Sequence, residues 1–100
     1  MTPEAERYRD QLRAMLPELA DRFGVAELGL FGSRVRGDHR PDSDLDVLVR
    51  FLPGRPVGLI TFGLLEEAIA ERLGVTVDLV PANSLRPHVR PSVMRDVEFV

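Results

Sequence analysis

The chain is built around residues 30–49, which have the sequence LFGSRVRGDHRPDSDLDVLV. The apolar run from Leu28 to Phe31 predicts a buried strand that stops at Gly32. Ser33 is a suitable N-cap for a helix of one turn, and Gly37 can end that helix by adopting a positive φ. The stretch therefore predicts a strand, a tight turn and a short helix whose first N–H groups can cradle a phosphate.

Two carboxylates follow this turn after a polar loop. We predict a second strand that carries both Asp44 and Asp46 and runs to about Phe51. Because successive side chains of a strand point to opposite faces, the two carboxylates share one face, while Leu45 and Val47 point to the other. A phosphate cradle beside a pair of metal-binding carboxylates indicates nucleotide chemistry.

The spacing of these residues resembles the signature of the polymerase-β-type nucleotidyltransferase superfamily: Gly32-Ser33, ten intervening residues, then Asp44-x-Asp46. The short length and the sequence of the turn look like the minimal nucleotidyltransferases (MNT), the antitoxin half of HEPN–MNT toxin–antitoxin pairs. The resemblance is strongest from about Val25 to Val80. A lone Asp-x-Asp is a weak signal, but its fixed distance from a Gly-Ser turn between two predicted strands makes the match specific.

A third carboxylate completes the expected metal site. Nucleotidyl transfer needs the charge of a triphosphate neutralised and the attacking oxygen held in line, and two Mg²⁺ ions about 4 Å apart can do both. Asp44 and Asp46 are the predicted ligands of both ions. Asp78 is the candidate third ligand, because an unpaired charge in the middle of a strand is costly to bury. The resemblance implies that this carboxylate acts on the metal that activates the attacking hydroxyl.

Four further residues bear on nucleotide binding. The resemblance implies that Gly32 and Ser33 hold the terminal phosphates of ATP, a function compatible with a simple helix cap. Arg36 is a candidate phosphate ligand, and ion pairs that brace the short helix are the alternative for both Arg36 and Arg34. Gly32-Ser33 is not a P-loop, because the Lys-Ser/Thr ending is missing.

The remaining polar residues near the motif have no predicted chemistry. We expect Asp42 and Ser43 to shape the loop, with Asp42 as an extra metal ligand the weaker interpretation. His39 and His88 lack the partnered spacing of a zinc site or a nucleophile triad and are expected to be exposed loop residues.

The rest of the chain predicts a small α/β (α+β) domain with a mixed sheet flanked by helices, a single domain over residues 1–100. A first helix starts at Thr2-Pro3 and is expected to break near Leu16, because Pro17 cannot donate the helical hydrogen bond; a short second helix runs from Pro17 to Gly24. The other expected elements, in chain order, are a strand at 25–31, a turn at 53–56, a helix at 59–73, a strand at 75–80, a loop at 81–84, a short helix at about 91–96 and an apolar segment at 97–100. In the helix at 59–73, residues 59, 62, 65, 69 and 73 lie on one face, and Gly74 follows its end.

Composition excludes several classes of function. No apolar run approaches the ~20 residues that span a bilayer, so no membrane association is expected. The net charge of −3 argues against stable nucleic-acid binding, since such a domain usually carries a basic excess. No cysteine is present, which excludes disulfides and thiolate metal sites. The polar N-terminus does not resemble a secretory signal, and a cytoplasmic protein is expected.

These observations predict a metal-dependent enzyme that transfers AMP from ATP to a hydroxyl. The residues do not encode the acceptor; the resemblance implies a tyrosine of a partner HEPN toxin, whose ribonuclease activity the modification would silence. We expect the cleft to be open on one side, with apolar residues near the C-terminus (Val93, Met94, Val97 and Phe99) either in the core or at that contact. Two alternatives stay open: transfer to a small molecule such as an aminoglycoside, and a non-catalytic antitoxin that acts by binding alone.

Overall fold

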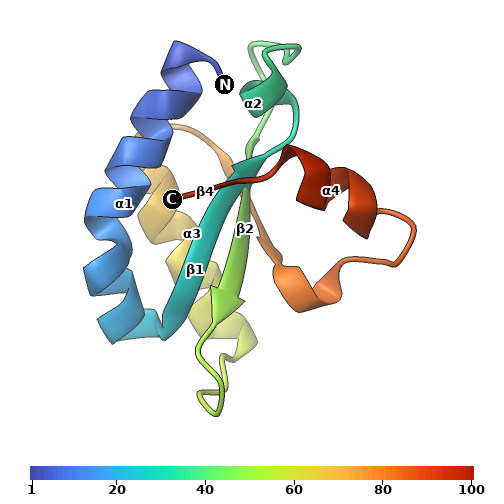
Figure 1. Cartoon of the computed structure of the whole chain (residues 1–100). Coiled ribbons are helices and arrows are strands. Elements are labelled where there is room, and N and C mark those ends of the chain that lie inside the picture. Colours follow the sequence, from blue (N-terminus) through green and yellow to red (C-terminus); the bar gives the residue numbers. More distant parts are fainter.

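Four strands form one mixed sheet in the computed structural model, which describes residues 1–100 (Figure 1). The strand order is β3-β2-β1-β4. β2 and β3 are parallel, whereas β1 is antiparallel to both of its neighbours. The strands are β1 (Val25–Phe31), β2 (Leu45–Phe51), β3 (Val77–Pro81) and β4 (Glu98–Phe99).

The helices cover the two faces of this sheet unequally. The long helices α1 (Pro3–Phe23) and α3 (Leu59–Leu73) pack on one face and against each other (Figure 1). The other face, which we call the open face, carries only α4 (Arg90–Asp96) and a 3-10 turn, η1 (Ala82–Ser84). A one-turn helix, α2 (Ser33–Arg36), lies at the end of β1. The predicted mixed sheet flanked by helices is confirmed.

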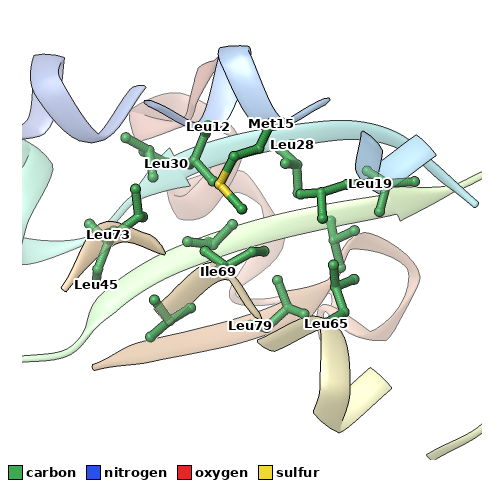
Figure 2. Close-up of a cluster of buried hydrophobic side chains, with 14 of the residues drawn as sticks. Leu12, Met15, Leu19, Leu28, Leu30, Leu45, Leu65, Ile69, Leu73 and Leu79 are labelled. Carbon is green, nitrogen blue, oxygen red and sulfur yellow. The ribbon is translucent and has the colours of Figure 1, made fainter. Parts of the chain in front are cut away.

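The hydrophobic core lies between the sheet and the two long helices (Figure 2). Sixteen buried side chains form one cluster, including Leu12, Met15 and Leu19 from α1 and Leu65 and Ile69 from α3. Complete burial of one such side chain contributes roughly 1.5–3 kcal/mol. Because the core takes one side of each strand, the alternate residues of β2 and β3 lie on the open face, where the polar chemistry of the chain is found.

α1 is continuous through Pro17, so the predicted break near Leu16 is wrong. Proline in a helix interior typically costs about 3 kcal/mol. Here Pro17 is exposed, while Leu12, Leu19 and Phe23 are buried on one stripe on both sides of it. Packing of that stripe against the sheet holds the helix together across the missing hydrogen bond.

The first turn of α3 differs from the predicted apolar face. Leu65, Ile69 and Leu73 are buried as expected, but Leu59 is 88% exposed and its neighbour Ile60 is 81% exposed. The spacing therefore located the helix correctly while assigning one turn too many to the core. Gly74 ends α3 with a φ of 69°, as predicted.

The C-terminal segment contains a strand that was not predicted. β4 pairs with β1 through Gly29 and Leu30, and the Val100 N–H donates to the Leu28 carbonyl at 3.0 Å. A Cβ on Gly29 would lie 2.6 Å from Val97 Cγ2, so a larger residue would force Val97 to shift, and glycine lets this segment lie closely against β1. The predicted short helix is confirmed as α4, beginning one residue earlier, and the expected loop at 81–84 is largely the 3-10 turn. No helix combines the length and the apolar character required to cross a membrane.

Candidate active site

Two glycines flank the one-turn helix α2 that follows β1. Gly32 has a φ of 85°, a conformation that favours glycine, and it is the N-cap of α2. The Gly32 carbonyl accepts hydrogen bonds from the Val35 and Arg36 N–H groups, both at 3.2 Å. The predicted N-cap at Ser33 is therefore wrong by one residue, because the positive φ at Gly32 starts the helix earlier. Gly37, at a φ of 86°, ends the helix as predicted.

Gly32 lies directly against Asp46. A Cβ on Gly32 would strike Asp46 Oδ2 and would lie 3.0 Å from Asp46 Cγ. Phe31, the last residue of β1, is the register partner of Asp46. Glycine is thus needed at position 32 both for its φ and for the close approach of the backbone to a carboxylate. The turn and the carboxylate form one site.

All three predicted carboxylates gather at this end of the sheet. Asp46 and Asp78 are register partners on the parallel strands β2 and β3, and Asp44 precedes β2 by one residue, rather than lying within the strand. Asp46 is half-buried, whereas Asp44 and Asp78 are exposed. The pKa of Asp46 is raised to about 6, mainly by burial and further by repulsion from Asp78 and Asp44, while Arg36 lowers it. The three negative charges are therefore close enough to repel one another.

This donor set fits divalent metal. No group of three or more His, Asp or Glu side chains is arranged as a complete set of metal ligands. Asp46 and Asp78 nevertheless sit side by side on adjacent strands, and their oxygens are the hard donors that Mg²⁺ prefers. A bound cation would offset the repulsion that raises the pKa of Asp46.

Arg36 and Arg34 take different places around the site. Arg36 forms ion pairs with Asp38 and Asp96, each at 3.2 Å, and these acids raise the pKa of its guanidinium. The expected alternative for Arg36, an ion pair that braces the short helix, is thus observed. Its contact with phosphate stays a prediction, supported by its electrostatic effect on Asp46.

Arg34 is the residue beside the motif whose structural importance the sequence did not reveal. Its side chain is buried, at 8% exposure. The guanidinium forms an ion pair with Glu4 at 2.8 Å and donates to the carbonyls of Ser43 at 2.9 Å and Pro41 at 3.4 Å. Arg34 therefore fixes the loop that immediately precedes Asp44. Bracing was the alternative considered for Arg34, but no sequence pattern links it to Glu4, thirty residues earlier.

The loop residues follow the sequence predictions in part. Ser43 shapes the loop, because its Oγ accepts from the Arg40 N–H and its own N–H donates to the Arg40 carbonyl, both at 3.0 Å. Asp42 is exposed. His88 is exposed as expected, but His39 is half-buried beside Glu4, so the prediction of an exposed His39 is wrong. Its Nδ1 atom is buried without a hydrogen-bond partner.

The geometry of the site agrees with comparisons to known proteins. A profile of the nucleotidyltransferase domain matches residues 12–100. The chain is 43% identical over 97 residues to the protein adenylyltransferase MntA of Thermococcus cleftensis, covering 95% of this chain and 94% of that protein. It also matches a solved structure attributed to a minimal nucleotidyltransferase, with 40% identity, a TM-score of 0.73 and coverage of 93% of this chain and 92% of the other.

A more distant structure shares the fold. It is a complex of the MNT antitoxin with a tri-AMPylated HEPN toxin from Shewanella oneidensis. The match has 19% identity and a TM-score of 0.65, and it covers 94% of this chain and 69% of that chain. Family and fold therefore agree with the Gly32-Ser33 turn and the carboxylates beside it: the chain belongs to the nucleotidyltransferase domain family, among its minimal nucleotidyltransferases.

Proposed function

We propose that this chain is a metal-dependent protein adenylyltransferase that transfers AMP from ATP to a tyrosine hydroxyl of a partner HEPN toxin, and so acts as an antitoxin. The observation that carries the proposal is the register of Asp46 with Asp78 beside Gly32. This juxtaposition puts carboxylates for metal binding next to backbone suited to phosphate. We further propose that the enzyme acts in the cytoplasm, where ATP and the ribonuclease toxin would meet.

The chemistry assigns one task to each group. The Gly32-Ser33 turn would hold the terminal phosphates, with Arg36 beside them, and Asp44 and Asp46 would hold the Mg²⁺ ions. Bound Mg²⁺ supplies the positive charge that neutralises the triphosphate. Asp78 lies on the side of the attacking oxygen. The tyrosine oxygen forms a bond to the α-phosphorus, the bond from that phosphorus to the bridging oxygen breaks, and pyrophosphate leaves. Asp78 would serve as the third metal ligand beside the attacking hydroxyl, and the hydroxyl proton passes to solvent.

Two similarities support the choice of acceptor. One relative is a protein adenylyltransferase by name, and one structure of the same fold is an MNT antitoxin bound to an AMPylated HEPN toxin. The open face carries only a short helix and a 3-10 turn, which leaves room for a protein acceptor rather than a closed pocket for a small molecule.

Intact-mass spectrometry of the toxin encoded beside this chain, co-purified with it, tests the proposal. Wild type should add one or more AMP units when ATP and Mg²⁺ are supplied, and none when either is omitted. Asp46→Asn should leave the toxin bound but unmodified. Asp21→Asn is the matched control, because Asp21 is exposed at the far end of α1. Neutralisation of the toxin by Asp46→Asn, with AMP never detected, would instead establish an antitoxin that acts by binding alone.

A further inference from the structure

Two adjoining hollows lie on the open face, at the end of β2 away from Asp46. One has a volume of about 350 Å³ and the other about 180 Å³. They share the same three residues, so we treat them as one feature, the β2–α4 groove. The residues that carry the argument are Arg50, Ala82 and Arg90, which line both hollows, and Leu48, Met94 and Phe99, which line the smaller one.

The groove combines positive charge with exposed apolar surface. The larger hollow contains Arg50 and Arg90 and no acidic residue. Arg90 donates to the Ala82 carbonyl at 3.4 Å and has no carboxylate partner, while Arg50 contacts Glu27, the one acidic residue that lines the smaller hollow, at 3.4 Å. Met94 and Phe99 are each 41% exposed. A ligand of this groove should therefore present a carboxylate to the arginines and an apolar side chain to its smaller hollow.

The strand register fixes where the groove lies relative to the site. Phe31 pairs with Asp46 and Glu27 pairs with Arg50, so β1 runs toward the site and the Gly32-Ser33 turn lies beyond Asp46. Arg50 follows Asp46 by four residues in the other direction, about 13 Å along the strand. The order along the open face is thus phosphate turn, carboxylates, groove.

The geometry of in-line transfer indicates from which side the acceptor would approach. The attacking oxygen, the phosphorus and the leaving oxygen must be roughly collinear. If pyrophosphate leaves toward Gly32 and Ser33, the acceptor hydroxyl has to approach the α-phosphorus from the opposite side, which is the side of Leu48 and the groove. The acceptor-bearing segment would then pass along the groove before reaching Asp78.

We infer that the β2–α4 groove is the docking site for the acceptor segment of the partner protein, a segment that carries an acidic side chain and an apolar side chain near its target tyrosine. The inference rests on the proposed function and adds the chemistry by which the partner is recognised. Arg50 and Arg90 bind the acidic group, and the pocket bounded by Leu48, Met94 and Phe99 takes the apolar one.

Charge reversal tests this docking directly. The double variant Arg50→Glu/Arg90→Glu should raise KM for the co-purified HEPN toxin at least 20-fold, with KM for ATP within twofold of wild type. The control Arg7→Glu/Arg13→Glu makes the same charge change on the exposed side of α1 and should leave both constants unchanged. Because a glutamate at position 50 faces Glu27, the neutral variant Arg50→Gln/Arg90→Gln is measured in parallel and should show a smaller effect in the same direction.

A second variant tests occupancy without a change of charge. Ala82→Phe fills both hollows and should also raise KM for the toxin while sparing ATP. Wild-type KM for the toxin in both the charge-reversed and the filled variants would overturn the inference. A raised KM for ATP with an unchanged KM for the toxin would assign the groove to the nucleotide and would overturn it as well.

Calorimetric titration of the toxin without ATP separates this inference from the proposed function. If wild type binds the toxin but never adds AMP, the enzyme proposal fails. In that case, weaker binding by Arg50→Glu/Arg90→Glu would still support docking in the groove, and unchanged binding would exclude it.

Discussion

Two arginines each tie a loop beside β2 to one end of α1, Arg34 to the N-terminal end and Arg55 to the C-terminal end. The two contacts differ in burial. Arg34 is buried and reaches α1 through an ion pair with Glu4. Arg55 is exposed and donates to the Asp21 carbonyl at 2.9 Å and to the Ala20 carbonyl at 3.4 Å, at the C-terminus of α1. Both contacts hold a loop, but only the loop held by Arg34 leads into a carboxylate of the site.

The difference indicates where this small domain concentrates its rigidity. A buried charge with specific partners is costly to disrupt, whereas exposed hydrogen bonds to a helix end are readily replaced by water. We therefore expect substitutions near Asp46 to destabilise the fold more than substitutions at the far end of β2, where Leu59 and Ile60 of the next helix are exposed. Four predictions test this contrast.

The largest effect should fall on activity at the carboxylate end. Asp78→Asn keeps the size of the side chain but removes a charge expected to hold metal, so AMP transfer should fall at least 1,000-fold, about 4 kcal/mol in the activation barrier. Thermal unfolding in metal-free buffer should be unchanged or slightly higher, because one repulsive charge has gone. Full activity of Asp78→Asn would remove Asp78 from the site.

Arg34→Met should give the largest loss of stability. Removing the guanidinium leaves Glu4 and the carbonyls of Ser43 and Pro41 without their donor, and because the Glu4 side chain is 37% exposed and can be solvated, the loss should be about 1–2 kcal/mol. Urea unfolding measures the loss. Arg34→Lys should recover only part of it, since an ammonium group cannot serve three separate acceptors with the geometry of a guanidinium. A loss below about 1 kcal/mol for Arg34→Met would show that the contact with Glu4 is not stabilising.

Stability should decrease with pH because of Asp46. Its pKa is about 6 in the folded chain against an ordinary value of 3.8, so the folded state binds this proton more tightly than the unfolded state. The contribution of Asp46 is therefore fully present below about pH 4 and is lost as the pH rises through 6, a decrease of about 2 kcal/mol after allowance for solvent screening. Asp46→Asn should remove this slope in metal-free buffer. A wild type and a variant with parallel pH profiles would contradict the assignment.

The smallest effects on stability should appear at the far end of β2. Arg55→Met should cost less than about 1 kcal/mol, because its hydrogen bonds are exposed. Leu59→Ser should change stability by less than about 0.5 kcal/mol, since the side chain is already in solvent. If Arg55→Met were as damaging as Arg34→Met in the same urea experiment, burial would not explain the difference between the two arginines.

The sequence was sufficient where the pattern is local. The bounds of β1 and the αL glycine at position 37 follow from apolar alternation and turn chemistry, whereas the position of Asp78 beside Asp46 was implied only by the family resemblance. The same reasoning brought Gly32 next to the carboxylates, and the structure adds that no other side chain fits there.

Long-range contacts account for what was missed. The continuation of α1 through Pro17 depends on packing against the sheet, and β4 depends on Gly29, about seventy residues earlier in the chain. The partnership of Arg34 with Glu4 likewise joins two segments that share no sequence motif. In each case the deciding interaction is a tertiary contact, which a local sequence pattern does not predict.

The parallel pairing of β2 and β3 has a consequence for the order in which this protein folds. Asp78 arrives beside Asp46 only after the chain has crossed over through α3, so a chain emerging from the ribosome with residues 1–51 alone would contain the turn and two carboxylates but not the third. Non-local pairing of this kind forms late, because loop closure must precede it. Completion of the carboxylate set therefore requires the crossover through α3, and a chain of residues 1–51 lacks both the third carboxylate and most of the β2–α4 groove.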